Sequence, residues 1–367
     1  MDRPASLWIM SAYRSESHAS WARWLEREAM ECNLNFRLFE LPGRYFRWRI
    51  RGNPLSWLTE VQDALMTEVP DHILATSMVD LSTLKGLHPS LAHVPVTLYF
   101  HENQFAYPVG EGQHSSIDPQ MVQLYGALSA NECWFNSSYN RDSFLQGMDA
   151  LLRMMPDYVP DNIVERIADK CRIVPVPVDP LERRQGASSR PLILWNHRWE
   201  YDKRPDRFLE LLDRLESDGV EFELALLGPR AKKVPKALLD IRSRHASRII
   251  ADGMVPRAEY EALLRSARVV ISTADHEFQG LAMIEAVSAG ASPVVPDALC
   301  YREQYPEQHR YPSGDMAAAA ALVKQALGAC EQVNQGEVDI SDWTSDKTAP
   351  IWRAFLQYKA QPQSTAE

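Results

Sequence analysis

The chain has 367 residues, enough for two domains with sizeable cores, and its formal net charge of −10 argues against indiscriminate binding to nucleic acid. No apolar run approaches the roughly 18 residues of a membrane-spanning helix, the N-terminus has no signal-peptide pattern, and the five cysteines never form a Cys-x-x-Cys pair. These features predict a soluble, cytoplasmic protein that does not dock on membranes and keeps its thiols reduced.

The first half of the chain alternates apolar strands with amphipathic helices. The expected strands lie at Leu7–Met10, His72–Thr76, Val94–Phe100, Glu132–Phe135 and Arg172–Val176. A loop over Ser11–Glu16 follows the first strand, and the expected helices lie at Ala19–Cys32, Leu55–Val69, Gln120–Ser129 and Asn136–Met148. This alternation is typical of a parallel, doubly wound α/β sheet.

A linker is expected at Asp179–Pro191, and the alternation starts afresh after it. The expected strands are Leu192–Trp195, Glu223–Leu227, Arg248–Ala251, Val269–Thr273 and Val294–Val295. The expected helices are Arg204–Leu215, Lys236–Arg244, Arg257–Arg268, Leu281–Ala289, Gly314–Cys330 and Trp343–Gln357. The sequence thus predicts two Rossmann-like domains facing a cleft, at residues 1–180 and 190–340. A closing helix within 341–367 is expected to pack back on the first domain.

The stretch from Ala274 to Ala286 places polar residues at the carboxyl end of an apolar strand. In open α/β sheets, ligands bind at this edge. Gly280 stands at the start of the next helix, where a backbone without a Cβ and with free N–H groups suits a phosphate. Glu277 and Glu285 can hold hydroxyl groups at two places along one extended ligand. The alternative is that Glu277 caps the helix and Glu285 is a solvated surface residue.

Two cations follow the first strand of the second domain. Arg198 and Lys203 stand five residues apart and could clamp a diphosphate, the arginine as a fork and the lysine as a point charge. Such a site also stabilises the charge that builds on a departing nucleoside diphosphate. The alternative is that both are surface cations beside Glu200 and Asp202.

Two polar clusters stand out in the first domain. The run from Gly43 to Arg51 interleaves four arginines, Arg47 and Arg49 among them, with aromatic residues that could stack on bases. An idle strand edge is the alternative. The second cluster begins with His101, Glu102, Asn103 and Gln104, directly after an expected strand. Asn136 and Ser137 follow the next one and either cap a helix or touch a ligand.

Together, the two glutamates, the two cations, the linker and the two Rossmann-like halves resemble a retaining glycosyltransferase of family 4 with the GT-B fold. The resemblance implies that Glu277 lies beside the transferred sugar, that Glu285 holds the nucleotide ribose, and that Arg198 and Lys203 bind the diphosphate. It implies no metal ion or other cofactor. The residues assigned to donor binding are Arg198, Lys203, Gly228, Arg230, Met254, Val255, Glu277, Gly280, Leu281, Ala282 and Glu285.

Four longer motifs are similar to the tRNA-queuosine mannosyltransferase family, and the similarity covers nearly the whole chain. The motifs lie at His101–Pro108, Phe135–Leu145, Trp195–Lys203 and Pro296–Pro306. The resemblance implies transfer of mannose from GDP-mannose to the cyclopentenediol of queuosine, at the anticodon wobble position of tRNA-Asp. One motif departs from the family pattern. A Tyr-Gly-Gly-Ser-His loop is replaced here by Arg14–His18, which keeps Ser17 and His18 but loses both glycines.

The resemblance also assigns roles in the first domain. His101 is expected to contact the donor sugar and, with Glu277, Arg198 and Lys203, to form the catalytic group. The residues assigned to the acceptor are Ser17, His18, Arg47, Arg49, Glu102, Asn103, Gln104, Asn136 and Ser137. Two alternatives stay open: a nucleotide-diphosphate hexosyltransferase with another acceptor, namely a related nucleoside, a glycan or a lipid, and a binding protein without turnover.

Overall fold

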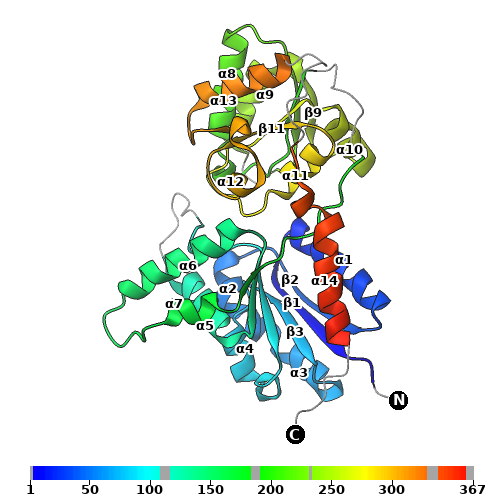
Figure 1. The fold of residues 1–367 in the computed structure, drawn as a ribbon, viewed down its shortest axis with the longest axis vertical. Helices are drawn as coiled ribbons and strands as arrows, with labels where there is room; N and C mark the ends of the chain where they lie inside the picture. The colour runs from blue at the N-terminus through cyan, green and yellow to red at the C-terminus, as the bar shows by residue number, and fades with distance from the viewer. Residues whose placement is uncertain (1–2, 108–115, 183–190, 231–233, 329–337, 361–367) are drawn as a thin grey trace. The chain divides into compact units, whose positions relative to one another are not determined.

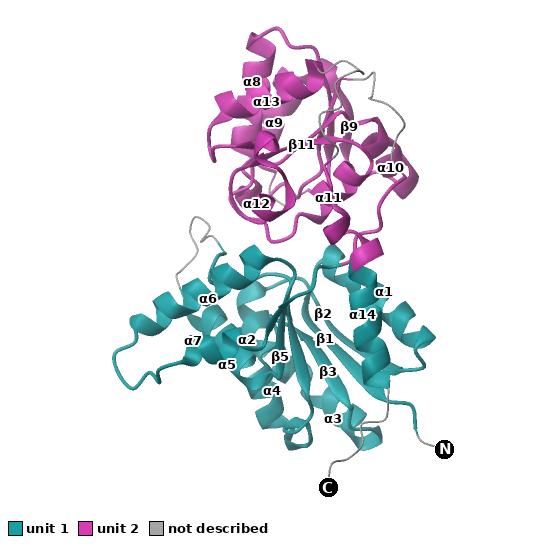
Figure 2. Cartoon of the chain, viewed as in Figure 1, with its two compact units in different colours: residues 1–176, 348–367 teal, residues 177–347 magenta. Residues whose placement is uncertain are grey.

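The structure is a computed structural model that describes residues 3–107, 116–182, 191–230, 234–328 and 338–360. The chain forms two compact units (Figure 2). Unit 1 contains residues 1–176 and 348–367, and unit 2 contains residues 177–347. Of the linker expected at Asp179–Pro191, residues 183–190 lie outside the described residues.

Within the described residues, a six-stranded parallel sheet forms the centre of unit 1 (Figure 1). Its strands in spatial order are β2 (Asn35–Pro42), β1 (Ser6–Arg14), β3 (His72–Thr76), β4 (Val96–Phe100), β5 (Glu132–Phe135) and β6 (Cys171–Ile173). The helices are α1 (Glu16–Glu31), α2 (Phe46–Ser56), α3 (Leu58–Thr67), α4 (Leu81–Leu87), α5 (Asp118–Ser129), α6 (Ser138–Arg153), α7 (Ile163–Ala168) and α14 (Ser345–Ala360). Because all neighbouring strands pair in parallel, the loops after them meet at one edge.

The described part of unit 2 contains a second six-stranded parallel sheet. Its strands in spatial order are β12 (Arg310–Tyr311), β11 (Ser292–Pro296), β10 (Val269–Ile271), β7 (Leu192–Trp195), β8 (Glu223–Leu227) and β9 (Ile249–Gly253). The helices are α8 (Pro205–Ser217), α9 (Lys236–Arg244), α10 (Arg257–Ser266), α11 (Leu281–Ser288), α12 (Tyr301–Gln304) and α13 (Met316–Gly328). Apolar side chains of α8, α9 and α13 pack against this sheet and form its core. The predicted α/β class with two parallel sheets is confirmed.

Several local predictions were wrong in unit 1. Ser11–Arg14 belong to strand β1 rather than to a loop, because they lie against β2, which pairs Ser11 with Glu40 and Arg14 with Pro42. Strand β2 itself was not predicted, since it lies at the sheet edge and carries polar residues between its apolar ones. The Gly43–Arg51 run leads into helix α2 rather than forming a strand edge.

The C-terminal helix α14 lies beside α1 in unit 1 (Figure 1). Its Trp352 is fully buried, and its indole N–H donates to the Pro175 carbonyl over 2.9 Å. The Trp352 ring centroid lies 5.5 Å from that of Trp21 and 5.1 Å from that of Tyr99. Arg353 forms an ion pair with Glu28 of α1. The last helix is therefore part of the core of the first unit.

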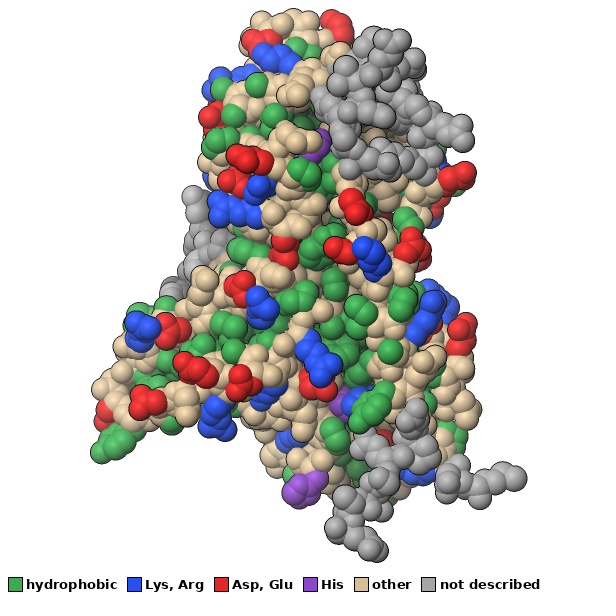
Figure 3. Space-filling view, in the orientation of Figure 1, with side chains coloured by type: hydrophobic (Ala, Val, Ile, Leu, Met, Phe, Trp, Pro, Cys, Tyr) green, Lys and Arg blue, Asp and Glu red, His purple; other side chains and the backbone are tan. Residues whose placement is uncertain are grey.

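The two chain segments that join the units run side by side. Val178 and Thr344 form a parallel β-bridge, and the N–H of Ser345 donates to the Val178 carbonyl over 2.8 Å. Unit 2 is thus inserted into unit 1 through two adjacent segments. On the face drawn in Figure 3, basic and acidic side chains are interspersed over each unit. Among the described residues, no helix combines the length and the apolar character that crossing a membrane requires.

Candidate functional site

An ion pair between Lys203 and Glu277 lies at the carboxyl edge of the unit 2 sheet. The Lys203 ammonium nitrogen is 3.1 Å from Glu277 Oε2 and also donates to the His276 carbonyl. Asp202 approaches the same nitrogen at 3.4 Å. The Lys203 side chain is 6% exposed and the Glu277 side chain 20%, so the carboxylate lies at the mouth of the site and the lysine behind it.

The charges at this edge hold one another in the ionised state. Burial alone raises the pKa of Glu277, but the charge and the hydrogen bond of Lys203, together with the neighbouring His197 and His276, lower it to about 2. Burial likewise opposes the ammonium of Lys203, yet Glu277 and Asp202 together keep its pKa above the usual value. Glu277 is therefore a carboxylate throughout the neutral range, which suits a residue that faces developing positive charge.

Arg198 is the exposed cation of the predicted pair. Its guanidinium lies 3.0 Å from Glu200 and 3.9 Å from Asp202, and its side chain is 47% exposed. Glu200 and Asp202, the acidic neighbours named in the alternative interpretation, thus do pair with the two cations. Asp202 contacts both Arg198 and Lys203 and therefore holds close together the two cations that are predicted to bind the diphosphate.

Helix α11 begins beside this pair. Gly280 precedes the helix with φ of +67°, and a Cβ there would lie 3.3 Å from the Tyr301 ring. Leu281 and Ala282 form the first turn, whose N–H groups have no carbonyl partner within the helix. Glu285, one turn further, accepts a hydrogen bond from the Tyr260 hydroxyl over 2.8 Å. The alternative of a solvated Glu285 is therefore wrong.

The partners of Glu285 were not predicted. Arg257 donates to Glu285 over 3.1 Å, and both Arg257 and Tyr260 come from α10. Asn196 donates to the Ala282 carbonyl over 2.8 Å and links the end of β7 to α11. Asn196 directly follows a strand, so its position in the sequence could have indicated that it belongs to the site. Nothing in the sequence pairs α10 with α11.

His197 joins two strand ends beneath the charged pair. Nε2 of its buried ring lies 3.1 Å from the Ile271 carbonyl oxygen. Because a carbonyl can only accept, Nε2 carries the proton and donates it. Burial lowers the pKa of His197 to about 4, with Lys203 acting in the same direction. A neutral imidazole therefore supports the site, and sequence reasoning missed it.

The residues expected around the nucleobase differ in exposure. Gly228 has φ of +93°, and a Cβ there would lie 2.3 Å from the His197 carbonyl oxygen, so the two loops touch through backbone. Met254 is 72% exposed, and Val255 is half-buried. Arg230 folds back, donating to the carbonyls of Leu226 and Gly228 and pairing with Asp252. Its guanidinium also covers the Trp199 ring at 4.8 Å. The assignment of Arg230 to donor binding stays a prediction.

In unit 1, His101 and His18 stack on each other. Their ring centroids are 4.1 Å apart, and Trp21 and Tyr99 meet the His101 ring edge-on, each at 4.6 Å. His18 Nδ1 donates to the Tyr13 carbonyl over 2.9 Å. Burial, together with His18, holds the pKa of His101 well below its usual value. Among the described residues, His101 Nε2 has no hydrogen-bond partner. His101 is therefore a neutral ring in an aromatic box.

Amide side chains fix the loop that carries His101. Asn136 donates to the His101 carbonyl over 2.9 Å and accepts from Asn140. Ser137 accepts from the Asn140 N–H and caps α6, as one alternative expected. Asn103 is fully buried and bonds to Asn140, Ser143 and its own loop. The assignment of Asn103, Asn136 and Ser137 to the acceptor stays a prediction.

The remaining acceptor candidates divide into exposed and inward residues. Ser17 is exposed at the start of α1, where its hydroxyl lies 3.0 Å from that of Ser15. Glu102 and Gln104 are half-buried and contact each other over 3.3 Å. Arg47 is exposed on α2, whereas Arg49 is buried and donates to Ser56. The assignment of Arg47 and Arg49 to the acceptor stays a prediction.

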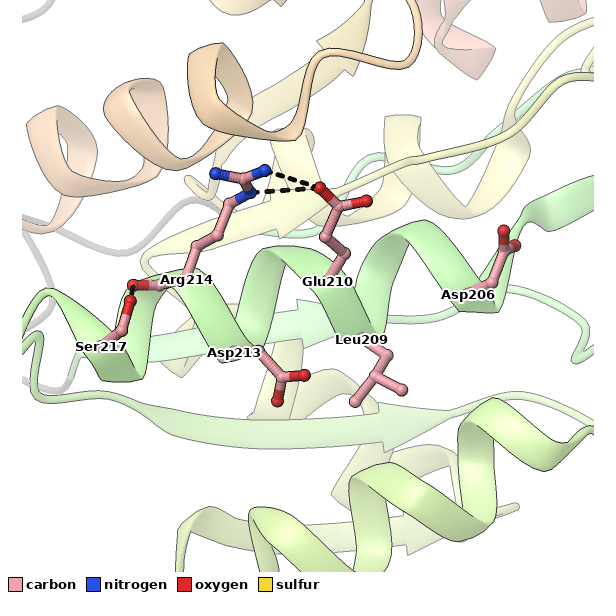
Figure 4. A pocket seen from close by; sticks show the side chains of 6 residues that line it. All are labelled: Asp206, Leu209, Glu210, Asp213, Arg214 and Ser217. Carbon is pink, nitrogen blue, oxygen red and sulfur yellow. Dashed lines mark hydrogen bonds and ion pairs between the residues drawn. The ribbon is translucent and has the colours of Figure 1, made fainter.

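One pocket lies apart from these residues. Figure 4 shows it along α8, lined by Asp206, Leu209, Glu210, Asp213, Arg214 and Ser217. Arg214 pairs with Glu210 there over 2.8 Å. None of the predicted site residues lines it.

Comparison with known proteins identifies both halves of the chain. Residues 6–178 match the family model described as tRNA-queuosine alpha-mannosyltransferase N-terminal, and residues 180–332 match glycosyl transferases group 1. The chain is 32% identical over 305 residues to a tRNA-queuosine alpha-mannosyltransferase of Drosophila melanogaster, an alignment that spans 80% of this chain and 79% of that protein.

Solved structures share the fold at low sequence identity. A sucrose-phosphate synthase from Thermosynechococcus elongatus superposes with a TM-score of 0.68 at 11% identity, over 97% of this chain and 95% of that chain. Anabaena HepE in complex with UDP and glucose superposes with a TM-score of 0.64 at 12% identity, over 97% and 98%. The fold is the GT-B type. The chain is a glycosyltransferase and belongs to the tRNA-queuosine alpha-mannosyltransferase family.

Proposed function

We propose that the protein transfers mannose from GDP-mannose to the cyclopentenediol of queuosine at the wobble position of tRNA-Asp, with retention of the anomeric configuration. The observation that carries this proposal is the similarity to a Drosophila protein named tRNA-queuosine alpha-mannosyltransferase, over about four fifths of both chains. The charged edge of unit 2 supports it, because it offers the groups that a nucleotide sugar requires.

The donor occupies the carboxyl edge of the unit 2 sheet in this proposal. Arg198 and Lys203 neutralise the diphosphate, which also approaches the N–H groups of Gly280, Leu281 and Ala282. Glu285, which is oriented by its hydrogen bond from Tyr260, accepts hydrogen bonds from the ribose hydroxyls. Gly228, Met254 and Val255 border the base. Glu277 lies beside the sugar.

The transfer step breaks the bond between the mannose anomeric carbon and the β-phosphate oxygen, and the electron pair leaves with GDP. A queuosine hydroxyl oxygen forms the new bond on the same face, and its proton passes to the departing β-phosphate. Positive charge builds on the anomeric carbon, and the Glu277 carboxylate stabilises it. Arg198 and Lys203 stabilise the negative charge on the leaving group.

The acceptor contacts unit 1 in this proposal. Ser17, His18, Glu102 and Gln104 approach the queuosine hydroxyls, while Asn103, Asn136 and Ser137 hold the loop in place. No cofactor beyond the donor takes part, so transfer in the presence of EDTA is expected to equal transfer without it. Restoration of lost activity by added Mg²⁺ would overturn that part.

A transfer assay tests the whole proposal. The protein is incubated with labelled GDP-mannose and with tRNA-Asp that carries either queuosine or guanosine at the wobble position, and the nucleosides are analysed by mass. The expected result is one hexose added to queuosine alone. UDP-glucose and other nucleotide sugars serve as competing donors. Label on both tRNAs, or on neither, would overturn the acceptor assignment.

A further inference from the structure

The N-terminal part of α2 presents an exposed aromatic and basic surface that the donor site does not use. Residues 43–56 contain four arginines and no acidic residue, in a chain whose net charge is −10. Tyr45 is 71% exposed and Trp48 49%. Arg44 places its guanidinium 5.6 Å from the Tyr45 ring centroid. Arg51 pairs with Asp80 over 2.7 Å, so we call the other four residues, Arg44, Tyr45, Arg47 and Trp48, the α2 surface.

Trp48 is held flat by a glycine one turn further along α2. A Cβ at Gly52 would lie 2.6 Å from the Trp48 indole atoms, so the ring rests on the bare backbone at that position. A glycine inside a helix costs stability relative to alanine. Here the absence of a Cβ lets one face of the indole lie on the helix while the ring keeps half of its surface exposed.

The α2 surface is connected to His101 through a short series of contacts. Phe46, next to Tyr45, meets the Tyr13 ring edge-on at 6.1 Å. The Tyr13 carbonyl accepts from His18, whose ring stacks on His101. Gly43 packs directly against the Arg14 carbonyl at the end of β1. The α2 surface and the His101 loop therefore lie at the same carboxyl edge of the unit 1 sheet.

We infer that Trp48 and Tyr45 form a stacking platform for unpaired nucleotides of the RNA acceptor, with Arg44 and Arg47 at their phosphates. This inference rests on the proposed function. Exposed aromatic faces between arginines are the chemistry that recognises single-stranded nucleic acid, since bases stack on the rings and the guanidinium groups neutralise the backbone. A protein partner with acidic side chains would use the arginines but leave the flat indole face without a matched group.

The test measures RNA binding and sugar transfer separately. Fluorescence anisotropy gives the Kd for the anticodon stem-loop of tRNA-Asp with queuosine, and steady-state assays give KM and kcat for the full tRNA. Trp48→Ala is expected to raise Kd and KM by about 5- to 100-fold, with little change in kcat. Trp48→Phe keeps an aromatic face and is expected to restore most of the binding.

Three further variants separate stacking from folding. Gly52→Ala keeps the Trp48 side chain but displaces its indole ring from the helix backbone. It is therefore expected to weaken RNA binding without destabilising the helix. Tyr358→Ala on α14 is the matched control, because Tyr358 is 62% exposed and also lies under a cation, Lys359, at 5.0 Å. This control is expected to leave Kd unchanged, while Tyr45→Ala raises it.

The outcomes distinguish this inference from the proposed function. Trp48-dependent RNA binding without mannose transfer would support the platform and overturn the function. Mannose transfer to queuosine tRNA with an unchanged Kd and KM in both Trp48→Ala and Tyr45→Ala would overturn the platform alone. A wild-type protein that binds no RNA would overturn both.

Discussion

At the scale of single residues, the donor edge contains charges that need one another. Lys203 is almost fully buried, and its nearest counter-charges are Glu277 and Asp202. Removing one member of such a group leaves a buried charge without compensation, which is costly for folding as well as for activity. A variant at this edge therefore needs a control variant in which an ion-paired carboxylate elsewhere in the chain is replaced in the same way.

Glu277→Gln is expected to lower kcat for transfer by about 100-fold or more, because it removes the negative charge beside the sugar while keeping the side-chain shape. The measurement is steady-state transfer with saturating donor. Glu210→Gln, which breaks the Glu210–Arg214 pair on α8, is the control and is expected to keep full activity. Equal losses in the two variants would contradict the assignment of Glu277.

The buried His197 predicts an acid-dependent loss of stability. Its pKa is about 4 when folded and about 6.5 when unfolded, so below pH 6.5 the unfolded chain binds the additional proton. Stability is therefore full above pH 6.5 and falls as the pH drops towards 4, by about 2 kcal/mol at pH 5 from this residue.

Urea unfolding at pH 7.5 and pH 5, followed by tryptophan fluorescence, measures this loss. His197→Gln keeps a donor for the Ile271 carbonyl but cannot be protonated, so it is expected to lose about 2 kcal/mol less than the wild type. His93→Gln, at an exposed position, is the control. An identical acid loss in wild type and His197→Gln would exclude His197 as the cause.

At the scale of elements, loops after parallel strands supply the site residues of each unit. In unit 2 the loops after β7 and β8 approach each other so closely that Gly228 touches the His197 carbonyl. This contact is possible because glycine has no Cβ and tolerates the positive φ.

Gly228→Ala is expected to lower the unfolding free energy by at least about 3 kcal/mol, because it adds a clash with backbone to the cost of the left-handed conformation. Gly219→Ala is the control, since Gly219 has φ of +70° but open space around its Cβ position. It is expected to cost only about 1–2 kcal/mol. Equal costs in denaturant unfolding would show that the loop contact contributes nothing.

Most central strands and the strand-end polar residues were predictable, because buried parallel strands are apolar runs and ligands bind at their carboxyl ends. Glu223–Leu227 and Lys236–Arg244 were predicted with their observed bounds. Strand β2 was missed because an edge strand mixes polar and apolar residues. Arg230 and Asn103 lie on loops after strands, as expected, and their side-chain partners were not predicted because tertiary contacts, rather than a local pattern, determine them.

At the scale of the whole molecule, the chain crosses between its two units twice. The last helix supplies Trp352 to the same aromatic group that surrounds His101, through Trp21 and Tyr99. Residues more than 300 positions apart in the sequence thus support one loop.

Trp352→Ala is expected to destabilise unit 1 by about 3–5 kcal/mol, since it empties a buried site and removes the hydrogen bond to Pro175. Ile351→Ala on the same helix is the control, because Ile351 is 45% exposed. It is expected to change stability by at most about 0.5 kcal/mol. Thermal unfolding compares them, and equal midpoints would contradict a core role for Trp352.

The side-by-side crossing at Val178 and Thr344 has a consequence for biosynthesis. A ribosome synthesises unit 2 as one uninterrupted segment, which lies between the two parts of unit 1. Until α14 emerges, Trp21, Tyr99 and Trp134 lack the ring that covers them. Unit 2 can therefore fold before α14 is synthesised, while the aromatic side chains of unit 1 that pack on Trp352 are still uncovered.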